Sequence, residues 1–331
     1  MREPAFWWRK PGLTSALLTP AAACYGAIAA GRMRRRGAQA GVPVICVGNF
    51  TLGGTGKTPT AIAIAEMLSA AGERPFLLTR GYGGREAGPR PVKSEADLPI
   101  DVGDEALLLA RVARTILARD RVAGAALARQ LGATVIVLDD GLQNSSLHKD
   151  FTLTVVDADR GFGNGRVFPA GPLRAPLPVQ LARSDALLLV GGELPRDLSF
   201  AAAKQRVFHA GLIPDAATLE RLRERRILAF AGIGHPEKFF ATLQAAGLEL
   251  AQCRAFPDHH RFTAGEAADL VKAAQRDRLL LLTTEKDRAR MTGDPVCTEL
   301  AAHSEVLPVR MEFSECDELR ARLLAAIKRG R

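Results

Sequence analysis

The stretch Val42 to Thr60 reads VPVICVGNFTLGGTGKTPT, an apolar run followed by a glycine-rich turn and then by Lys57 and Thr58. The β-branched residues before the turn are typical of a buried parallel strand, and the apolar spacing after Thr58 is typical of a helix. Glycine lets backbone N–H groups close around phosphate oxygens where a Cβ would obstruct them. The pattern predicts a phosphate-binding loop, formed by Gly53, Gly54, Thr55, Gly56, Lys57 and Thr58.

Two residues of this loop have predicted chemical roles. Lys57 would reach the terminal phosphates, and Thr58 would offer its hydroxyl to Mg²⁺ at the positive end of the helix dipole. The sequence departs from G-x-x-x-x-G-K-[ST] at the first position, where Thr51 stands. Because that position shapes the turn and does not touch phosphate, nucleotide binding remains the prediction. The alternative is a glycine-rich turn that merely precedes a lysine.

A second polar motif ends the β-branched run TVIVLDDGLQN at Asp139 and Asp140. The carboxyl edge of parallel strands is where a doubly wound sheet binds its ligands. In phosphate-loop proteins a carboxylate at that edge holds Mg²⁺ directly or through water. We therefore expect Asp139 and Asp140 to serve a metal together with Thr58, although Asp-Asp-Gly alone is also a common turn.

The length of 331 residues predicts about two domains, each with its own core. We expect an α/β fold: a doubly wound, mostly parallel phosphate-loop sheet with a second, smaller α/β domain. The charged run ERLRERR marks the boundary between them. The expected divisions are a membrane-associated helix at 1–36, the nucleotide-binding domain at 37–222, the smaller domain at 223–308, and a C-terminal strand end and helix at 309–331 that pack back on the first domain.

The apolar patterns predict individual strands and helices along this chain. Strands are expected at 74–80, 114–118, 134–140, 150–157, 186–190, 205–213, 227–233 and 279–284 and near 306–313. Helices are expected from residue 58, after Val102, and at 121–131, 236–246, 264–276 and 316–329. The five cysteines are far apart with no C-x-x-C pair, which indicates a reduced, cytosolic chain without a zinc site.

The N-terminal segment at 12–31 carries no charge and has basic residues on both sides. It is long enough to span a bilayer, but its alanines, glycines and Pro20 argue against insertion. We favour a helix lying on an anionic membrane surface over a spanning helix or a secretory signal. The predicted apolar stripe is Phe6, Leu13, Leu17, Cys24 and Ile28, beside Trp7 and Trp8, and the basic flanks are Arg2, Arg9, Lys10, Arg32, Arg34, Arg35 and Arg36.

Three further segments are ambiguous when judged from their residues alone. The loop DADRGFGNGRVFPAGPLRAPL is either a surface crossover or an anion clamp built on Arg160, Arg166 and Arg174. Acidic residues in a first helical turn, as at Asp104 and Glu105, are ordinarily caps. Asp258, His259 and His260 lack the helical spacing of a zinc site, so a surface histidine pair is the simple interpretation. By contrast, Thr283 to Asp287 (TTEKD) ends a buried strand in polar residues, as a ligand-facing edge would.

Seven motifs, in this order, resemble the tetraacyldisaccharide 4'-kinases of lipid A assembly. They are GNFTLGGTGKTP, RGYGG, VGDEA, VLDDGLQN, DADRGFGNGRVFPAGPLR, FPDHH and TTEKD, and they cover nearly the whole chain after residue 40. The resemblance implies a two-domain enzyme on the cytoplasmic face of the inner membrane of Gram-negative bacteria. It implies transfer of the γ-phosphate of ATP to the 4'-hydroxyl of a tetraacyl glucosamine disaccharide 1-phosphate, which gives lipid IV A.

The resemblance also implies roles for residues that the patterns alone left open. Asp104 would be the base for the sugar hydroxyl, and His259 would orient it or support its charge. Glu105 would add a carboxylate near the Mg²⁺ that Thr58, Asp139 and Asp140 hold. Asn164, Arg166 and Arg174 would face the disaccharide or its 1-phosphate. Asn144 stands where many members have histidine, which puts only an indirect contact in doubt.

Two rival functions remain to be weighed against this resemblance. A membrane-associated switch ATPase of the partitioning or division-site type has a similar loop, but its signature lysine is replaced here by Leu52. A nucleic-acid-binding protein would interleave basic residues with stacking aromatics in a folded groove. Here the basic residues flank an apolar stretch, so no nucleic-acid partner is expected.

Overall fold

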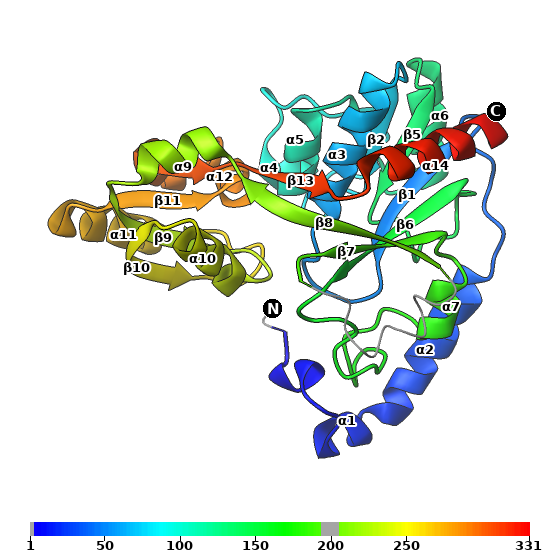
Figure 1. Ribbon diagram of the computed structural model, residues 1–331, viewed down its shortest axis with the longest axis horizontal. Helices are drawn as coiled ribbons and strands as arrows, with labels where there is room; N and C mark the ends of the chain where they lie inside the picture. The colour runs from blue at the N-terminus through cyan, green and yellow to red at the C-terminus, as the bar shows by residue number, and fades with distance from the viewer. Residues whose placement is uncertain (1–2, 193–204) are drawn as a thin grey trace.

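The computed structural model describes residues 3–192 and 205–331. In these residues the strands form a nine-stranded sheet and a four-stranded sheet. The long antiparallel pair β8 (Arg206–Pro214) and β13 (Val309–Phe313) runs from the large sheet toward the small one, as Figure 1 shows. The chain therefore leaves the large part through β8 and returns to it through β13.

The large sheet has the strand order β13-β8-β7-β6-β1-β5-β2-β4-β3. Its pairings are parallel except for β13 with β8 and β3 with β4. Because β1 lies between β5 and β6, the loop that follows β1 begins at the point where ligands bind in open α/β sheets. The remaining strands are β1 (Val44–Asn49), β2 (Pro75–Thr79), β3 (Arg90–Pro91), β4 (Thr115–Leu117), β5 (Val135–Asp139), β6 (Phe151–Asp157) and β7 (Ala186–Val190).

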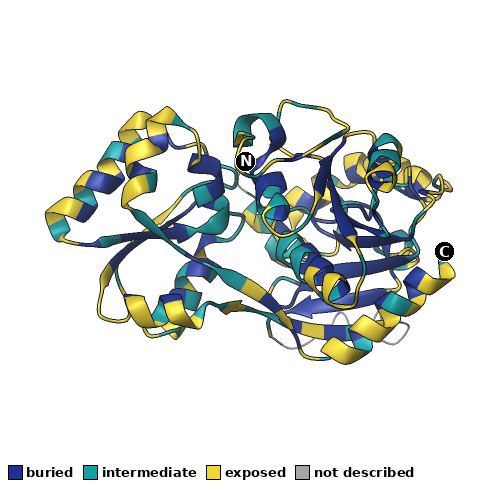
Figure 2. Cartoon of the chain, turned by 90° about the horizontal axis from the view of Figure 1, so that it is seen from above, coloured by how far each residue is buried: buried dark blue, intermediate teal, exposed yellow. Residues whose placement is uncertain are grey.

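Helices cover both faces of the large sheet because alternate strand residues point to opposite sides. Ile45 and Val47 pack with α3 (Lys57–Ala70), α5 (Asp104–Ala110) and α14 (Cys316–Arg329). Val44 and Cys46 pack on the other face with α6 (Arg121–Gln130). The inner strands of the large sheet form the dark, buried centre of that part in Figure 2. Two short helices, α4 (Pro99–Val102) and α7 (Leu177–Leu181), lie in the connections.

The small sheet is all parallel, in the order β10-β9-β11-β12. One core cluster joins it to α11 and α13, and another joins it to α9 and α10. Its strands are β9 (Arg226–Ala231), β10 (Glu249–Ala255), β11 (Leu280–Thr284) and β12 (Ser304–Leu307). Its helices are α9 (Ala216–Leu222), α10 (Pro236–Ala245), α11 (Ala264–Asp277), α12 (Glu285–Met291), the 3-10 turn η3 (Pro295–Cys297) and α13 (Thr298–His303).

The α/β class with a mostly parallel large sheet is confirmed, but one strand prediction was wrong, and two strands, β3 and β10, were not predicted. The strand expected near 306–313 is two strands in different sheets, β12 and β13, on either side of Pro308. Strand β10 was not predicted because it is an edge strand of the small sheet with exposed polar residues such as Glu249 and Arg254. An edge strand that faces solvent lacks the apolar run that identifies a buried one.

The N-terminal segment is not the single striped helix that we expected. It forms the 3-10 turn η1 (Ala5–Trp8), the short helix α1 (Leu13–Leu17) and the longer α2 (Thr19–Met33). Pro20 in the first turn of α2 has no N–H to continue the helix from α1, and Phe6 lies in η1, so the stripe is interrupted. In the described residues no helix is long and apolar enough to cross a bilayer. Arg2, in the predicted basic flank, lies outside them.

The two tryptophans are also not at a free surface, contrary to expectation. Trp7 is buried and donates its indole N–H to the Pro169 carbonyl at 3.1 Å. Trp8 lies under the Arg160 guanidinium, 4.6 Å from the ring centroid. Helix α2 buries a face of small residues and Met33, while the side chains of Leu13 and Leu17 are 86% and 81% exposed. The exposed apolar surface of this segment is therefore made by Leu13, Leu17, Tyr25 and Ile28.

Candidate active site

The loop after β1 has the backbone conformation that its glycines permit. Gly53 and Gly56 have φ angles of 103° and 87°, in the region that other residues rarely adopt. Lys57 is the first residue of α3, so its backbone N–H lies at the positive end of that helix. The Asn49 amide donates to the Thr51 carbonyl at 2.7 Å, and Arg174 Nε donates to the same oxygen at 2.9 Å. Side chains of β1 and of the 158–176 segment thus fix the backbone at Thr51, directly before the loop.

Asp139 lies at the end of β5 beside this loop and is almost fully buried. Thr58 Oγ1 donates to Asp139 Oδ2 at 3.3 Å, while the buried Asp139 Oδ1 has no hydrogen-bond partner among residues 3–192 and 205–331. Burial, together with the carboxylates of Glu105 and Asp140, raises the pKa of Asp139 to about 7. An unpaired, desolvated carboxylate of this kind is poised to accept a cation.

Asp140, the next residue, has a different environment. Its carboxylate accepts two hydrogen bonds from Arg174 Nη1, at 2.9 and 3.0 Å. Burial opposes ionisation, but the charges of Lys57 and Arg174 outweigh it and lower the pKa of Asp140 to about 2. Arg174 was predicted to face the glycolipid, and here it neutralises Asp140 and bonds the phosphate loop. These bonds use Nε and Nη1, and among the described residues Nη2 makes no hydrogen bond, so this nitrogen retains donors for a ligand.

The second group of charges lies between α5 of the large part and α12 of the small part. Asp104, the first residue of α5, is buried and accepts hydrogen bonds from Arg290 at 2.6 and 3.2 Å. His259 Nδ1 is 3.4 Å from the same carboxylate oxygen. Burial would raise the pKa of Asp104, but His259, Lys286 and Arg290 together hold it well below its usual value. Asp104 and His259, predicted as partners, are neighbours in space.

Glu105 on α5 also has a partner on α12, the helix that carries Arg290. Lys286 Nζ donates to Glu105 Oε1 at 3.0 Å and lies 3.7 Å from Asp258 Oδ1 and 3.5 Å from His259 Nε2. Burial lowers the pKa of Lys286, but the carboxylates of Glu105, Asp258 and Asp104 raise it well above its usual value. Glu105 was predicted to serve a metal, and in this structure its carboxylate is engaged by an ammonium group.

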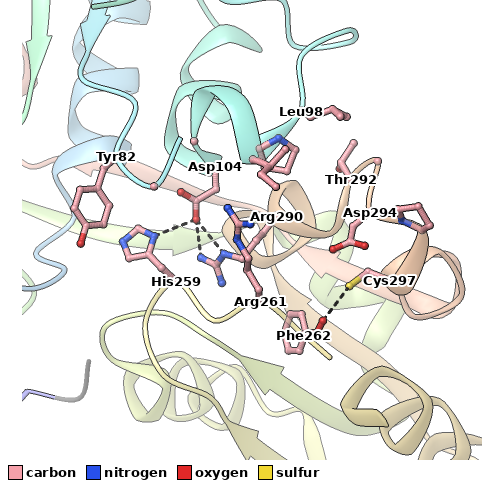
Figure 3. A pocket seen from close by; sticks show the side chains of 16 residues that line it. Tyr82, Leu98, Asp104, His259, Arg261, Phe262, Arg290, Thr292, Asp294 and Cys297 are labelled. Carbon is pink, nitrogen blue, oxygen red and sulfur yellow. Dashed lines mark hydrogen bonds and ion pairs between the residues drawn. The ribbon is translucent and has the colours of Figure 1, made fainter. Parts of the chain in front are cut away.

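A cavity of about 290 Å³ opens beside Asp104 and His259. Figure 3 shows Tyr82 and His259 on one side of Asp104, with dashed lines from His259 and Arg290 to its carboxylate. Leu98, Phe262 and Cys297 contribute to the rest of the lining. The cavity is bounded by residues of both parts of the chain, so a ligand within it would touch the large and small domains together.

The 158–176 segment uses two of its predicted substrate residues for its own packing. The Asn164 side chain donates to the Ala170 carbonyl at 2.9 Å and accepts from the Arg166 backbone N–H at 3.0 Å. Arg166 Nη1 donates to Thr19 Oγ1 of α2 at 2.9 Å. The structure therefore brings Lys57, Thr58, Asp139 and Asp140 together at the phosphate loop. It brings Asp104 and His259 together in a second group. Asn164 and Arg166 lie instead beside the N-terminal segment.

The donor set near the phosphate loop fits a magnesium ion that a nucleotide helps to hold. The described residues contain no group of three His, Cys, Asp or Glu side chains that could hold a metal alone. Magnesium usually takes one or two carboxylates together with substrate phosphates. The partnerless Asp139 Oδ1 next to the Thr58 hydroxyl matches that requirement.

Three charged residues of this site had no predicted role, although one of them, Lys286, lies in the TTEKD segment that was expected to face a ligand. Arg290 and Lys286 contact α5, and Lys238 joins Asp157 and Asp159 at 3.2 and 3.1 Å. The available signal was the helical spacing of Lys286, Asp287 and Arg290 directly after a strand end. The partners of Lys286 and Arg290 lie 181 and 186 residues earlier in the chain, and Asp157 lies 81 residues before Lys238, so no local pattern identified these contacts.

Comparisons with known proteins extend over both parts of the chain. A family model described as tetraacyldisaccharide-1-P 4'-kinase matches residues 14–328. A protein named tetraacyldisaccharide 4'-kinase from Rhodopseudomonas palustris (strain BisB5) is 52% identical over 334 residues, which cover 100% of this chain and 98% of that protein. A protein of the same name from Nitrobacter hamburgensis is 52% identical over 334 residues, with 100% of each chain covered.

A solved structure has the same fold. LpxK from Aquifex aeolicus, crystallised in complex with ATP, matches with a TM-score of 0.74 at 24% sequence identity. The match covers 95% of this chain and 100% of the other. At that identity the likeness supports the two-sheet α/β architecture alone.

The opposite pKa shifts of Asp139 and Asp140 predict opposite effects on stability. The pKa of Asp139 is raised from 3.8 to about 7 in the folded protein, so the folded state holds this proton more tightly than the unfolded state does. The resulting stabilisation is fully present below the pKa of the unfolded protein and is lost as the pH rises through the pKa of the folded protein. Asp139→Asn should therefore raise the free energy of unfolding at about pH 8, without metal or nucleotide, by something on the order of 1–3 kcal/mol.

The neighbouring Asp140→Asn is the matched control. The pKa of Asp140 is lowered to about 2, so its contribution is present above the unfolded value, and its removal should destabilise at the same pH. Urea unfolding of the two variants and the native protein at about pH 5 and pH 8 measures both effects. Asp139→Asn less stable than the native protein at pH 8 would contradict the electrostatic account.

Proposed function

The chain belongs to the tetraacyldisaccharide 4'-kinase family, and from that membership we propose that it transfers the γ-phosphate of ATP to the 4'-hydroxyl of a tetraacyl glucosamine disaccharide 1-phosphate, which forms lipid IV A. The match over residues 14–328 carries this proposal, because it includes the phosphate loop and the small domain alike. The activity is that of a phosphotransferase with an alcohol group as acceptor.

ATP would bind at the loop between β1 and α3. The backbone N–H groups of Gly53 to Lys57 would surround its phosphates, and the Lys57 ammonium would neutralise their terminal charge. Thr58 and Asp139 would hold Mg²⁺, with Asp140 and Glu105 close by. The ion, when bound, supplies positive charge that neutralises the phosphate oxygens during transfer. The partnerless Asp139 oxygen supports this assignment.

Asp104 would receive the proton of the acceptor hydroxyl as the new P–O bond forms and ADP departs. Its low pKa means that the carboxylate is ionised and free to accept at neutral pH, although it is a weak base. Phosphoryl transfer passes through a loose transition state in which positioning the nucleophile matters more than removing its proton early. His259, 3.4 Å away, would support the charge and orientation of Asp104.

The glycolipid would approach from the side of the N-terminal helices. Arg166 is bonded to Thr19 of α2, and Asn164 shapes the loop that carries it. Arg166 and Arg174 are proposed to bind the disaccharide or its 1-phosphate, since a guanidinium suits a phosphate ligand. The exposed Leu13, Leu17 and Ile28, with the arginines that follow α2, would place the enzyme on the cytoplasmic face of the inner membrane.

The alternative function, a membrane-associated switch ATPase, is not favoured. Its loop lysine is absent at Leu52, and the family match extends through the small domain, where His259 and Lys286 reach the α5 carboxylates. A switch ATPase needs no base for a sugar hydroxyl.

Product formation tests the proposed reaction directly. Purified protein with ATP, Mg²⁺ and the tetraacyl disaccharide 1-phosphate should yield the bisphosphate, detected by mass spectrometry. Lys57→Met should abolish transfer with little change in thermal stability, because Lys57 neutralises phosphate and is not part of the core. A folded Lys57→Met variant with near-native turnover would overturn the phosphate-loop assignment, and no bisphosphate from the native protein would overturn the reaction.

Membrane association is tested with two exposed leucines. Leu13→Ser with Leu17→Ser should weaken binding to vesicles of anionic phospholipid by about tenfold or more, since a buried leucine contributes roughly 1.5–3 kcal/mol. Leu131→Ser, at a 40% exposed leucine after α6, is the matched control and should leave vesicle binding unchanged. Nucleotide binding should persist in the double variant and in the control variant. Equal vesicle binding by the double variant and the control would contradict the membrane-facing assignment.

A further inference from the structure

Arg290 is a buried cation that the reaction as described above does not use. Its side chain is 6% exposed, and it lies on α12 between the two parts of the chain. Nε and Nη2 donate to Asp104 Oδ2 at 3.2 and 2.6 Å. Nη1 donates to Asp287 Oδ1 at 2.8 Å, to the Gly232 carbonyl at 3.1 Å and to the His260 carbonyl at 3.2 Å. Every nitrogen of the guanidinium is therefore engaged.

The two carboxylate oxygens of Asp104 have different numbers of contacts. Oδ2 receives both Arg290 bonds and lies 3.4 Å from His259 Nδ1. Within the described part of the chain, Oδ1 accepts only the adjacent Glu105 backbone N–H, at 3.0 Å. A carboxylate oxygen has room for two acceptor contacts, so Oδ1 retains capacity for one more donor. The dashed lines in Figure 3 converge on one oxygen of Asp104 and leave the other free of side-chain contacts.

We propose that Arg290 is a positioning residue, which clamps Oδ2 of Asp104 from the small domain so that Oδ1 faces the acceptor hydroxyl. The proposal rests on the kinase function proposed above. The Nε–H and Nη2–H groups of Arg290 converge on this one oxygen, and the ammonium group of a lysine, at the end of a flexible stem, would not hold both contacts. Arg290 thereby orients a group of the large domain through a residue of the small domain, and the base is in place only when both parts are assembled.

Asp287 fixes Arg290 in turn. Asp287 is the third residue of α12 and is fully buried. Its carboxylate accepts hydrogen bonds from the Gly232 backbone N–H at 3.1 Å, from Thr284 Oγ1 at 2.7 Å and from Arg290. The Arg290 guanidinium is thus anchored at one end to the small sheet and presents its other edge to Asp104. The charged and titratable groups around Asp104 are Arg290, Lys286 and Asp287 on α12, His259 and Asp258 on the 256–263 segment, and Glu105 on α5.

The competing explanation is that Arg290 only stabilises the contact between the two parts. A buried ion pair that loses one partner is strongly destabilising whatever its role. Stability alone therefore cannot distinguish the two explanations. The distinction lies in whether the effect of changing Arg290 depends on the Asp104 carboxylate.

The test compares Arg290→Lys in the native background and in an Asp104→Ala background. In the native background the lysine keeps the charge but loses the paired N–H contacts, and kcat for the glycolipid should fall by about 10²-fold, the usual cost of a misplaced catalytic group. KM for ATP should stay within about twofold, because the phosphate loop is untouched. In the Asp104→Ala background the same change should lower kcat by less than about twofold, because residues that act as a unit are not additive.

Two further variants keep the test decisive. Arg288→Lys, on the same helix, donates to the Ala301 carbonyl and does not contact Asp104, so its kcat should match the native value. Asp287→Asn, which weakens the anchor of Arg290, should give a smaller kcat loss that also disappears in the Asp104→Ala background, and it stands in if Arg290→Lys does not fold. Native-like kcat in both Arg290→Lys and Asp287→Asn would overturn the proposal. An equal fall of kcat for Arg290→Lys in the native and the Asp104→Ala backgrounds would also overturn it. Absence of product from the native protein would overturn the proposed function instead.

Discussion

The placement of the small domain depends on a set of charges that neither domain can satisfy alone. Asp104 and Glu105 on α5 face Arg290 and Lys286 on α12, and the closest pair is 2.6 Å apart with both side chains nearly buried. Charges removed from water must be paired, and loss of one partner leaves a large desolvation cost on the other. The four residues therefore fix where the two parts meet. Because Asp104 is one of them, the same contact that joins the domains also prepares the proposed base.

Beside the phosphate loop, two adjacent carboxylates differ in how their charge is balanced. Among the residues that the structure describes, Asp139 has no counter-ion within hydrogen-bonding distance, whereas Asp140 is neutralised by Arg174. The pKa values of the two adjacent carboxyls are shifted in opposite directions. A site with one unpaired, buried carboxylate is less stable than it could be, which is the usual compromise at functional positions. In the proposed function a cation would satisfy this carboxylate, and in a kinase that cation comes with the nucleotide.

The sequence was most informative where periodicity or a motif is local. The parallel strands that are buried on both faces, the loop from Gly53 to Thr58 and the strand-end Asp139 all follow from short patterns. Strand β10, at an exposed edge, and the interruption at Pro20 did not, because solvent exposure and one proline override an apolar pattern. Arg290 and Lys286 could not be found locally, since their partners on α5 lie 186 and 181 residues away. Family resemblance supplied Asp104 and His259, which residue patterns alone had suggested to be a helix cap and a surface histidine.

The central claim, that Asp104 and His259 work as one unit across the domain contact, is tested most directly by a double-mutant cycle. The measurement is kcat for phosphate transfer to the tetraacyl glycolipid by Asp104→Ala, His259→Ala and the double variant, with ATP affinity as the control. The account predicts a fall of roughly 10²–10⁴ for Asp104→Ala, a smaller fall for His259→Ala, and a double variant little worse than Asp104→Ala. Fully additive losses, or near-native kcat in Asp104→Ala with only about 1 kcal/mol of lost stability as expected for a helix cap, would contradict it.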